Sequence, residues 1–360
     1  MSIIEEFAER LDKDVRDDNV NGSISAAIIK DDEIIWRKSF GTRTVHDGIP
    51  ADPHTIYRAG SITKSLTAFL MMQLVQDGII ALDDPIEKHL PEIQGLEGYT
   101  DLTKITFRQI ASHTSGLIRE PKLENADAGP IEEWGSKVLQ SIPKTSFEAK
   151  PGERFSYSNI GYGILGVALS RAVNQSFIDL IHEKILKPLR MDDSFFTVPE
   201  HKLKNLAQGI WGGPFGEEDL NLESPAREHR GRGYKVPNGG IYSTPTDLGK
   251  FLIANMSKGG ILAKEYLELM QTKQTPELTY NGYGFGFEIY QNKQMTIVGH
   301  AGGVPGYSSY FGFEKEQHFG IVIMRNYNWG TTSWDLGQKI LLGKLADFER
   351  SRGNTKSQVA

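Results

Sequence analysis

Patterns of β-forming residues stand near the start of the chain, after an amphipathic segment. The opening residues 1–7 combine apolar positions with acidic ones, which predicts an amphipathic helix and not a secretory signal. Ser23–Lys30 and Ile34–Phe40 are β-rich runs joined by the polar residues 31–33. This order predicts an antiparallel hairpin that follows the first helix.

One later segment is apolar on nearly every side. It runs from Leu66 to Val75 and stops before Gly78, a pattern typical of a buried central helix. Its length is about half of what a bilayer-spanning helix needs. We expect Ser61 to lie in the first turn of this helix.

The middle of the chain differs in pattern from its two ends. Residues 82–263 show mostly helical segments broken by Pro, Gly and long loops. After them, strands are expected at Tyr283–Tyr290, Gln294–Gly299, Tyr307–Phe313 and Phe319–Arg325, followed by a closing helix at Trp334–Phe348.

Because both ends of the chain are predicted to combine a helix with antiparallel strands, we expect an α/β fold of the α+β type with two lobes. Residues 1–81 and 264–349 would form one discontinuous lobe, an antiparallel sheet flanked by helices. Residues 82–263 would form an inserted, mostly helical lobe, and residues 350–360 a polar tail.

Composition narrows the class of partner. The 360 residues are 39% hydrophobic and 24% charged, as in a globular protein, and the formal net charge is -6. Such a charge gives no basic field for nucleic acid or anionic lipid, so the expected partner is a small molecule or a peptide. The absence of cysteine excludes disulfides and thiol chemistry. Lacking a secretory signal, the protein is expected to be cytoplasmic, and the sequence leaves its oligomeric state open.

Ser61 and Lys64 form a Ser-x-x-Lys motif at the start of the apolar helix. A serine hydroxyl is a poor nucleophile unless a base lies within hydrogen-bond reach and donors wait for the oxyanion. Residues three apart share one helix face, and the amides of the first turn are unpaired donors. The motif alone is weak, because a capping serine followed by a solvated lysine is a common pattern.

Two further segments support the interpretation of Ser61 and Lys64 as a nucleophile and its base. At Tyr157-Ser158-Asn159 a loop meets an apolar helix that begins near Ile160, and alternate residues of an extended segment point the same way. Tyr157 and Asn159 are therefore expected in one cleft. His300-Ala301-Gly302-Gly303 ends a strand-like run, where glycines allow a ligand or another backbone to approach closely.

In this order the three elements resemble the serine β-lactamase and penicillin-binding protein superfamily. Tyr-Ser-Asn is similar to the second motif of the class C β-lactamase, DD-peptidase and family VIII esterase branch. His-Ala-Gly departs from Lys-Thr-Gly and resembles the His-x-Gly variant of some DD-peptidases, D-aminopeptidases and esterases. The resemblance covers residues 5–345 and includes Ser112–Leu117, Pro151-Gly152 and Pro237–Thr244.

The resemblance implies a role for each motif residue. Ser61 would be the acylated nucleophile, with Lys64 and Tyr157 as the proton-transfer pair, and which of these two is the base stays open. Asn159 would hold the substrate amide or the lysine amine. His300 would orient the leaving side of the substrate, with Gly302 and Gly303 beside it. The backbone amides of Ser61 and Gly303 would form the oxyanion hole.

Other enzyme classes fit less well. No Gly-x-Ser-x-Gly pentapeptide is present, which excludes the α/β-hydrolase nucleophile. His182-Glu183 lacks the second histidine of a zinc-protease helix, and Gly249-Lys250 lacks the Ser or Thr of a phosphate loop. No metal or cofactor is therefore implied.

An acyl-serine hydrolase of a small-molecule ester, amide or peptide remains, first as an esterase or short-peptide hydrolase and alternatively as a DD-peptidase or weak β-lactamase. A purely binding role is disfavoured because Ser61, Lys64 and Tyr157 are all present.

Overall fold

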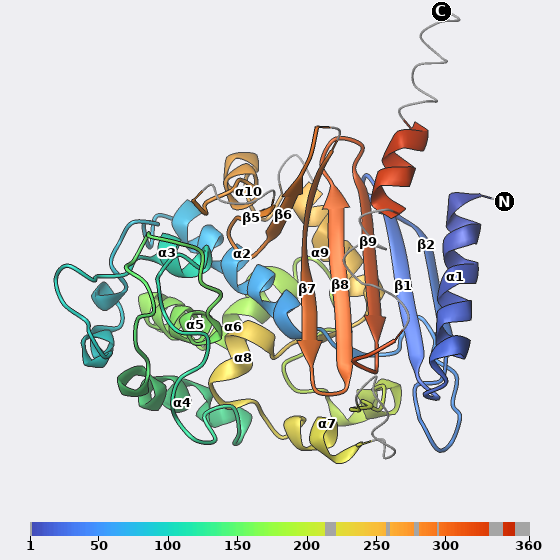
Figure 1. Cartoon of the computed structure of the whole chain (residues 1–360), viewed down its shortest axis with the longest axis horizontal. Coiled ribbons are helices and arrows are strands. Elements are labelled where there is room, and N and C mark those ends of the chain that lie inside the picture. The colour runs from blue at the N-terminus through green and yellow to red at the C-terminus, as the bar shows by residue number, and fades with distance from the viewer. Residues whose placement is uncertain are drawn as a thin grey trace, which may run out of the picture.

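The computed structural model describes residues 2–212, 221–256, 260–276, 281–293, 295–330 and 341–349. These residues form a central antiparallel sheet in the order β2-β1-β9-β8-β7-β6-β5 (Figure 1). Its strands are β1 (Ser23–Lys30), β2 (Glu33–Gly41), β5 (Asn281–Tyr283), β6 (Glu288–Gln291), β7 (Thr296–Val304), β8 (Tyr307–Glu314) and β9 (Phe319–Arg325).

Helices surround this sheet and fill the middle of the chain. The α-helices are α1 (Ile3–Asp18), α2 (Thr63–Gln76), α3 (Phe107–Ala111), α4 (Trp134–Ser141), α5 (Asn159–Val173), α6 (Phe177–Ile181), α7 (Glu223–Glu228), α8 (Val236–Gly239), α9 (Pro245–Met256) and α10 (Lys264–Met270). Short 3₁₀ or π turns are η1 (Gly60–Ile62), η2 (Ile86–Lys88), η3 (Pro91–Gly95), η4 (Ile131–Glu133), η5 (Ile142–Lys144), η6 (His182–Leu186), η7 (Glu200–Asn205) and η8 (Gly233–Lys235). A second sheet pairs β3 (Tyr57–Arg58) with β4 (Tyr242–Ser243).

The large sheet is buried on both faces, as neighbouring residues of β1 show. Ile28 belongs to the hydrophobic cluster formed with α1 and the helical residues 341–349, whereas Ala27 belongs to the cluster formed with α2 and α9. Successive strand residues point to opposite faces, so each face has its own core. Figure 1 shows α1 and the last helix near each other beside β1 and β2, although they come from opposite ends of the chain.

Both ends of the chain meet inside the sheet. β1 pairs with β9 in antiparallel register, from Ile24 opposite Arg325 to Lys30 opposite Phe319. This mixed architecture of helices and an antiparallel sheet confirms the fold class expected from the sequence. The division into lobes stays an expectation. We propose that α9, although it lies within 82–263, belongs with the sheet against which it packs.

The structure corrects three local predictions. Tyr283–Tyr290 is not one strand, because a turn at residues 284–287 separates β5 from β6. β7 continues through the predicted end at Gly299 to Val304, so His300 lies inside a strand. Ser61 lies in η1, just before α2 begins, and not in the first turn of α2. The polar tail and residues 334–340 of the predicted closing helix lie outside the described residues.

Candidate active site

The turn that carries Ser61 is pressed against β7. Gly60 has φ +55, a left-handed conformation that glycine adopts without a steric penalty. A Cβ atom built on Gly60 would lie 2.8 Å from the backbone nitrogen of Gly303. The Ser309 hydroxyl donates to the carbonyl of Ala59 at 2.7 Å and ties β8 to the same turn. Only a residue without a side chain fits before Ser61, and this close approach brings the backbones of Ser61 and Gly303 together.

Lys64 lies directly below the nucleophile. Its Nζ is 3.2 Å from Ser61 Oγ and 3.0 Å from the carbonyl oxygen of Asn238 in α8. The side chain is fully buried. Burial, followed by the positive charges of Arg119 and Arg232, holds the pKa of Lys64 well below its usual value. The site therefore favours an unprotonated amine beside the serine hydroxyl.

Tyr157 behaves in the opposite way. Its ring lies under the Lys64 amine, whose Nζ is 4.8 Å from the ring centroid. Burial raises the pKa of Tyr157, and a hydrogen bond with the Ser61 side chain only partly offsets this. Tyr157 is thus held as a neutral phenol, which can donate a proton but is a poor base.

His113 holds the Tyr157 segment in place. Its ring lies 4.2 Å from the Tyr157 ring, centroid to centroid, at an interplanar angle of 33°. Its Nδ1 accepts a hydrogen bond from the Ser158 amide at 3.0 Å, and its carbonyl accepts one from the Ser156 amide at 2.7 Å. The histidine has φ +57. Its neighbours in sequence were noted for their resemblance to the family, but the contact with Tyr157 was not predicted.

Asn159 is the first residue of α5 rather than part of an extended segment, because Ser158 caps the helix. Its Nδ2 donates to Glu120 Oε1 at 2.6 Å, and its Oδ1 is buried without a hydrogen-bond partner among the described residues. The Lys64 amine bonds to Asn238 and not to Asn159. Because Oδ1 is closed off from solvent, a substrate N–H could reach it only if the side chain moved.

His300 lies beneath this surface and not on it. Its Nε2 is 2.9 Å from the hydroxyl of Tyr283, its Nδ1 is 2.6 Å from the carbonyl of Ala301, and the side chain is buried. Burial lowers the pKa of His300 to about 3. The ring is therefore neutral and does not line the pocket next to Ser61.

The two glycines after His300 differ in their surroundings. A Cβ on Gly302 would lie 2.1 Å from the Ala59 carbonyl oxygen, whereas a Cβ on Gly303 would meet nothing within 4 Å. Gly302 packs the strand against the Ser61 turn. Gly303 borders open space and lines the pocket.

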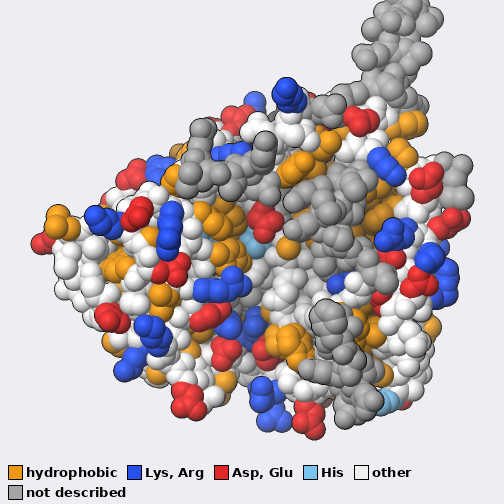
Figure 2. All heavy atoms as spheres, viewed as in Figure 1, with side chains coloured by type: hydrophobic (Ala, Val, Ile, Leu, Met, Phe, Trp, Pro, Cys, Tyr) orange, Lys and Arg blue, Asp and Glu red, His pale blue; other side chains and the backbone are white. Residues whose placement is uncertain are grey.

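A pocket of about 240 Å³ opens at Ser61. Figure 2 shows basic and acidic side chains gathered side by side near the middle of this face, over the region where Figure 1 places α8. The lining residues are Ser61, Arg119, Glu120, Asp127, Asn159, Glu228, Arg232, Lys235, Asn238, Gly239, Gly303, Val304 and Pro305. The structure thus brings Ser61, Asn159 and Gly303 together at the pocket, with Lys64, Tyr157 and His300 packed behind them.

Comparison with known proteins identifies the family of this chain. A family model described as Beta-lactamase matches residues 7–336. This chain belongs to the Beta-lactamase family. The resemblance inferred from the three motifs is thereby confirmed at the level of the family.

Curated relatives of this Beta-lactamase chain are longer than the chain itself. Protein flp of Staphylococcus aureus (strain N315) is 26% identical over 332 residues, which cover 89% of this chain and 63% of that protein. Beta-lactamase-like protein 2 of Dictyostelium discoideum is 29% identical over 326 residues, 88% of this chain and 58% of that protein. The chain therefore spans less than two thirds of the length of these relatives.

Solved structures support the same family. The octameric penicillin-binding protein homologue from Pyrococcus abyssi is 30% identical with a TM-score of 0.72, covering 90% of this chain and 72% of that one. A beta-lactamase/D-alanine carboxypeptidase from Yersinia pestis, complexed with citrate, is 23% identical with a TM-score of 0.76, covering 96% and 97%. The second likeness concerns the fold alone.

Sequence reasoning missed all six charged residues that line the Beta-lactamase-family pocket. They come from two separate stretches of the chain, 119–127 and 228–235, and follow no local pattern: Arg119, Glu120, Asp127, Glu228, Arg232 and Lys235. The available signal was their position between the recognised motifs, which is too general to select them.

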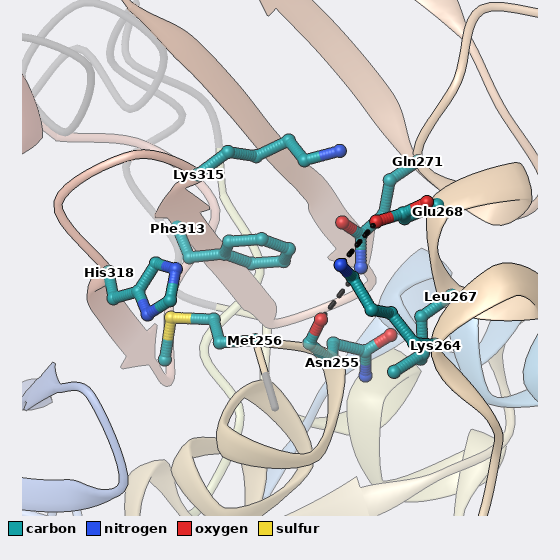
Figure 3. A pocket seen from close by; sticks show the side chains of 9 residues that line it. All are labelled: Asn255, Met256, Lys264, Leu267, Glu268, Gln271, Phe313, Lys315 and His318. Carbon is teal, nitrogen blue, oxygen red and sulfur yellow. Dashed lines mark hydrogen bonds and ion pairs between the residues drawn. The ribbon is translucent and has the colours of Figure 1, made fainter. Parts of the chain in front are cut away.

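A second pocket of about 220 Å³ lies between α9, α10 and the turn from β8 to β9 (Figure 3). There Lys264 pairs with Glu268 at 3.3 Å, and the Gln271 side chain donates to the Asn255 carbonyl at 2.7 Å. None of the motif residues lines this pocket.

No single helix among the described residues is long and apolar enough to cross a membrane. Two consecutive helices, Asn159–Val173 and Phe177–Leu186, would be long and apolar enough if they were counted as one segment, but the chain bends by 83° between them.

Proposed function

We propose that this chain is a serine hydrolase that works through an acyl intermediate on Ser61. One observation carries the proposal: a fully buried lysine amine, whose pKa is held well below its usual value, lies 3.2 Å from the Ser61 hydroxyl. A neutral amine at hydrogen-bond distance is what a serine needs in order to become a nucleophile near neutral pH.

Each step uses a group already in place. Lys64 Nζ takes the proton of Ser61 Oγ as the oxygen attacks the substrate carbonyl. The backbone N–H groups of Ser61 and Gly303 bind the oxyanion, which is stabilised by donors fixed in advance. As the intermediate collapses, the neutral Tyr157 hydroxyl gives its proton to the leaving group and regains one from the Lys64 ammonium. Water then attacks the acyl-serine with the same pair reversing its roles.

The substrate we propose is a small ester or a short peptide amide. One observation supports it: the pocket at Ser61 is small, about 240 Å³. A D-alanyl-D-alanine peptidase or a weak β-lactamase is the alternative. Conversion of a β-lactam would need rapid deacylation, and we identify no residue dedicated to that step.

The test is Ser61→Ala. It removes the atom that forms the acyl-enzyme, so turnover of p-nitrophenyl esters should fall by about a thousandfold or more. The matched control is Ser136→Ala, at an exposed serine of α4, which should keep parental activity.

Intact mass after a brief reaction should show an acyl adduct on the parent and on the control only. D-amino-acid amides, D-Ala-D-Ala peptides and nitrocefin assayed in parallel decide between the substrate classes. Activity of Ser61→Ala within tenfold of the parent would refute the proposed nucleophile.

A further inference from the structure

Two buried guanidinium groups share one carboxylate beside the pocket. Arg58 Nη1 donates to Glu228 Oε2 at 2.6 Å, and Arg232 Nε lies 3.0 Å from the same oxygen. The side chains of Arg58 and Arg232 are 0% and 9% exposed. A buried charge is costly unless it is paired, so this cluster carries one positive charge without a partner.

The other charges at the pocket do not supply that partner. Lys235 Nζ lies 3.2 Å from Asp127 and 3.5 Å from Glu120, and Arg119 is 3.8 Å from Glu120. Each of these two cations therefore faces a carboxylate of its own. With the Arg58 and Arg232 pair included, four basic side chains stand against three carboxylates, in a chain whose formal net charge is -6.

Arg232 is placed to act on a molecule bound at Ser61. Its Nη1 donates to the Gly239 carbonyl at 2.8 Å. A Cβ on Gly239 would lie 2.6 Å from that nitrogen and 3.8 Å from the carbonyl carbon of Gly60, so the guanidinium reaches the nucleophile turn across one glycine. Nη2 has no hydrogen-bond partner among the described residues, and unlike Nε it is not closed off from solvent.

The pocket lies on one side of the nucleophile. It is lined by Ser61, Asn159 and Gly303 but not by Tyr157. In the proposed function the leaving group must lie at Tyr157 to receive its proton, so the pocket holds the acyl part of the substrate. Its volume of about 240 Å³ is below the range of about 300–1,000 Å³ typical of pockets for drug-sized ligands, which suits a short chain.

We propose that this pocket binds short acyl groups that carry a carboxylate, and that Arg232 is the residue that binds this carboxylate. The inference rests on the proposed acyl-serine function. An Arg–carboxylate pair in a partly dry site is a strong, charge-assisted interaction, and the unpartnered Nη2 of Arg232 is the nitrogen that would donate to the carboxylate and position the acyl chain. The bound carboxylate also supplies the counter-charge that the Arg58 and Arg232 cluster lacks.

The test compares mono-p-nitrophenyl adipate with methyl p-nitrophenyl adipate, two esters with the same leaving group and acyl chain, of which the second has its carboxylate masked. After subtraction of the rates without protein, the parent should show a kcat/KM at least about tenfold higher for the free carboxylate, as a charge-assisted contact implies. A ratio near or below one overturns the proposal.

Arg232→Gln should lower that ratio by about tenfold or more. The variant leaves Glu228 paired with Arg58, so the buried carboxylate keeps its counter-charge. Lys235→Gln is the matched control, because it removes a cation of the same pocket that already has carboxylate partners, and it should change the ratio by less than about threefold. A folded Arg232→Gln variant with the parental ratio overturns the assignment.

A second measurement needs no variant. Adipate should inhibit parental turnover of the methyl ester competitively, whereas the uncharged adipamide should not, and equal inhibition by both overturns the proposal. Failure of the proposed function itself would look different, since neither ester would then leave an acyl adduct on Ser61.

Discussion

At the scale of single residues, the site shifts the pKa values of Lys64 and Tyr157 in opposite directions. Burial is the main cause of both shifts, because it disfavours the charged form of each group. The two shifts favour the neutral amine of Lys64 and the neutral phenol of Tyr157. The sequence left open which of the two is the base, and this difference leads us to propose Lys64.

Two residues that share one proton path should show losses that do not multiply. Lys64→Ala and Tyr157→Phe should each lower kcat/KM by about a hundredfold or more. We expect the double variant to be little worse than the worse single one. Steady-state rates on one neutral ester measure all three, with circular dichroism as the control for folding. Losses that multiply cleanly would show that the two side chains act independently.

His113 should act on catalysis through Tyr157. In His113→Ala the Tyr157 ring loses its stacking partner and the Ser158 amide its acceptor, so kcat should fall by about tenfold to a hundredfold with little change in KM. His113→Asn should recover part of the loss, because asparagine tolerates positive φ and offers an oxygen to that amide. An effect on KM alone, or no advantage of Asn over Ala, would argue against this role.

At the scale of elements, β7 and the Ser61 turn form one packed unit. Gly302→Ala places a methyl group 2.1 Å from a backbone carbonyl oxygen, which overpacks the contact, whereas Gly303→Ala meets nothing within 4 Å. The first variant should lose about 1–3 kcal/mol or more of unfolding free energy, and the second almost none. Urea denaturation of the two neighbouring variants measures the difference directly. Equal stabilities would show that β7 and the turn are not in tight contact.

The elements that the sequence predicted well are those with a local pattern. The hairpin of β1 and β2 follows from two runs rich in β-forming residues and the polar turn between them, and its predicted bounds differ from the observed ones by one residue at either end of the second strand. The break between β5 and β6 has a cause outside the segment. Gly286 has φ +73, and a Cβ there would lie 2.8 Å from the Lys64 carbonyl oxygen, so the turn is shaped by α2. Such a contact cannot be predicted from the hydrophobic periodicity of the segment.

Within the candidate site, too, the sequence predicted the contacts between residues that are close in the chain. Ser61 and Lys64 are three residues apart on one helix start, so their contact follows from sequence spacing. The position of Asn159 depends on the cap that Ser158 forms, and the burial of His300 depends on Tyr283 across the sheet. The roles given to these two residues stay predictions. These roles depend on packing between segments that are distant in the chain, and such packing cannot be derived from a single sequence.

At the scale of the whole molecule, the buried His113 and His300 and the half-buried His229 should make stability depend on pH. Burial holds the pKa of His113 well below its usual value, and lowers that of His229 to about 4 and that of His300 to about 3. Between these values and about 6.5, the unfolded chain binds protons that the folded chain does not. The contribution of these histidines to stability should therefore be complete above pH 6.5 and fall as the pH drops, by up to about 1.4 kcal/mol per pH unit for each histidine.

Urea midpoints at pH 7, 6 and 5 test this, because most carboxylates take up protons only below about pH 4.5. The raised pKa of Asp247 works in the opposite direction. His229→Gln should flatten the slope by up to one proton, while the exposed His46→Gln should leave it unchanged. A midpoint that is flat from pH 7 to pH 5 would contradict the expected protonation behaviour.

The pairing of β1 with β9 has a consequence for how the protein is made. When β1 and β2 leave the ribosome, the strand that must lie beside β1 has not yet been synthesised, since Ile24 pairs with Arg325. A lone hairpin is marginally stable, and its open edge attracts other strands. The Ser61 turn likewise waits for Gly303. A nascent chain that ends before Gly303 thus contains Ser61 and Lys64 but cannot assemble the proposed oxyanion site, so the proposed hydrolytic activity would arise only after β7 and β9 have been synthesised.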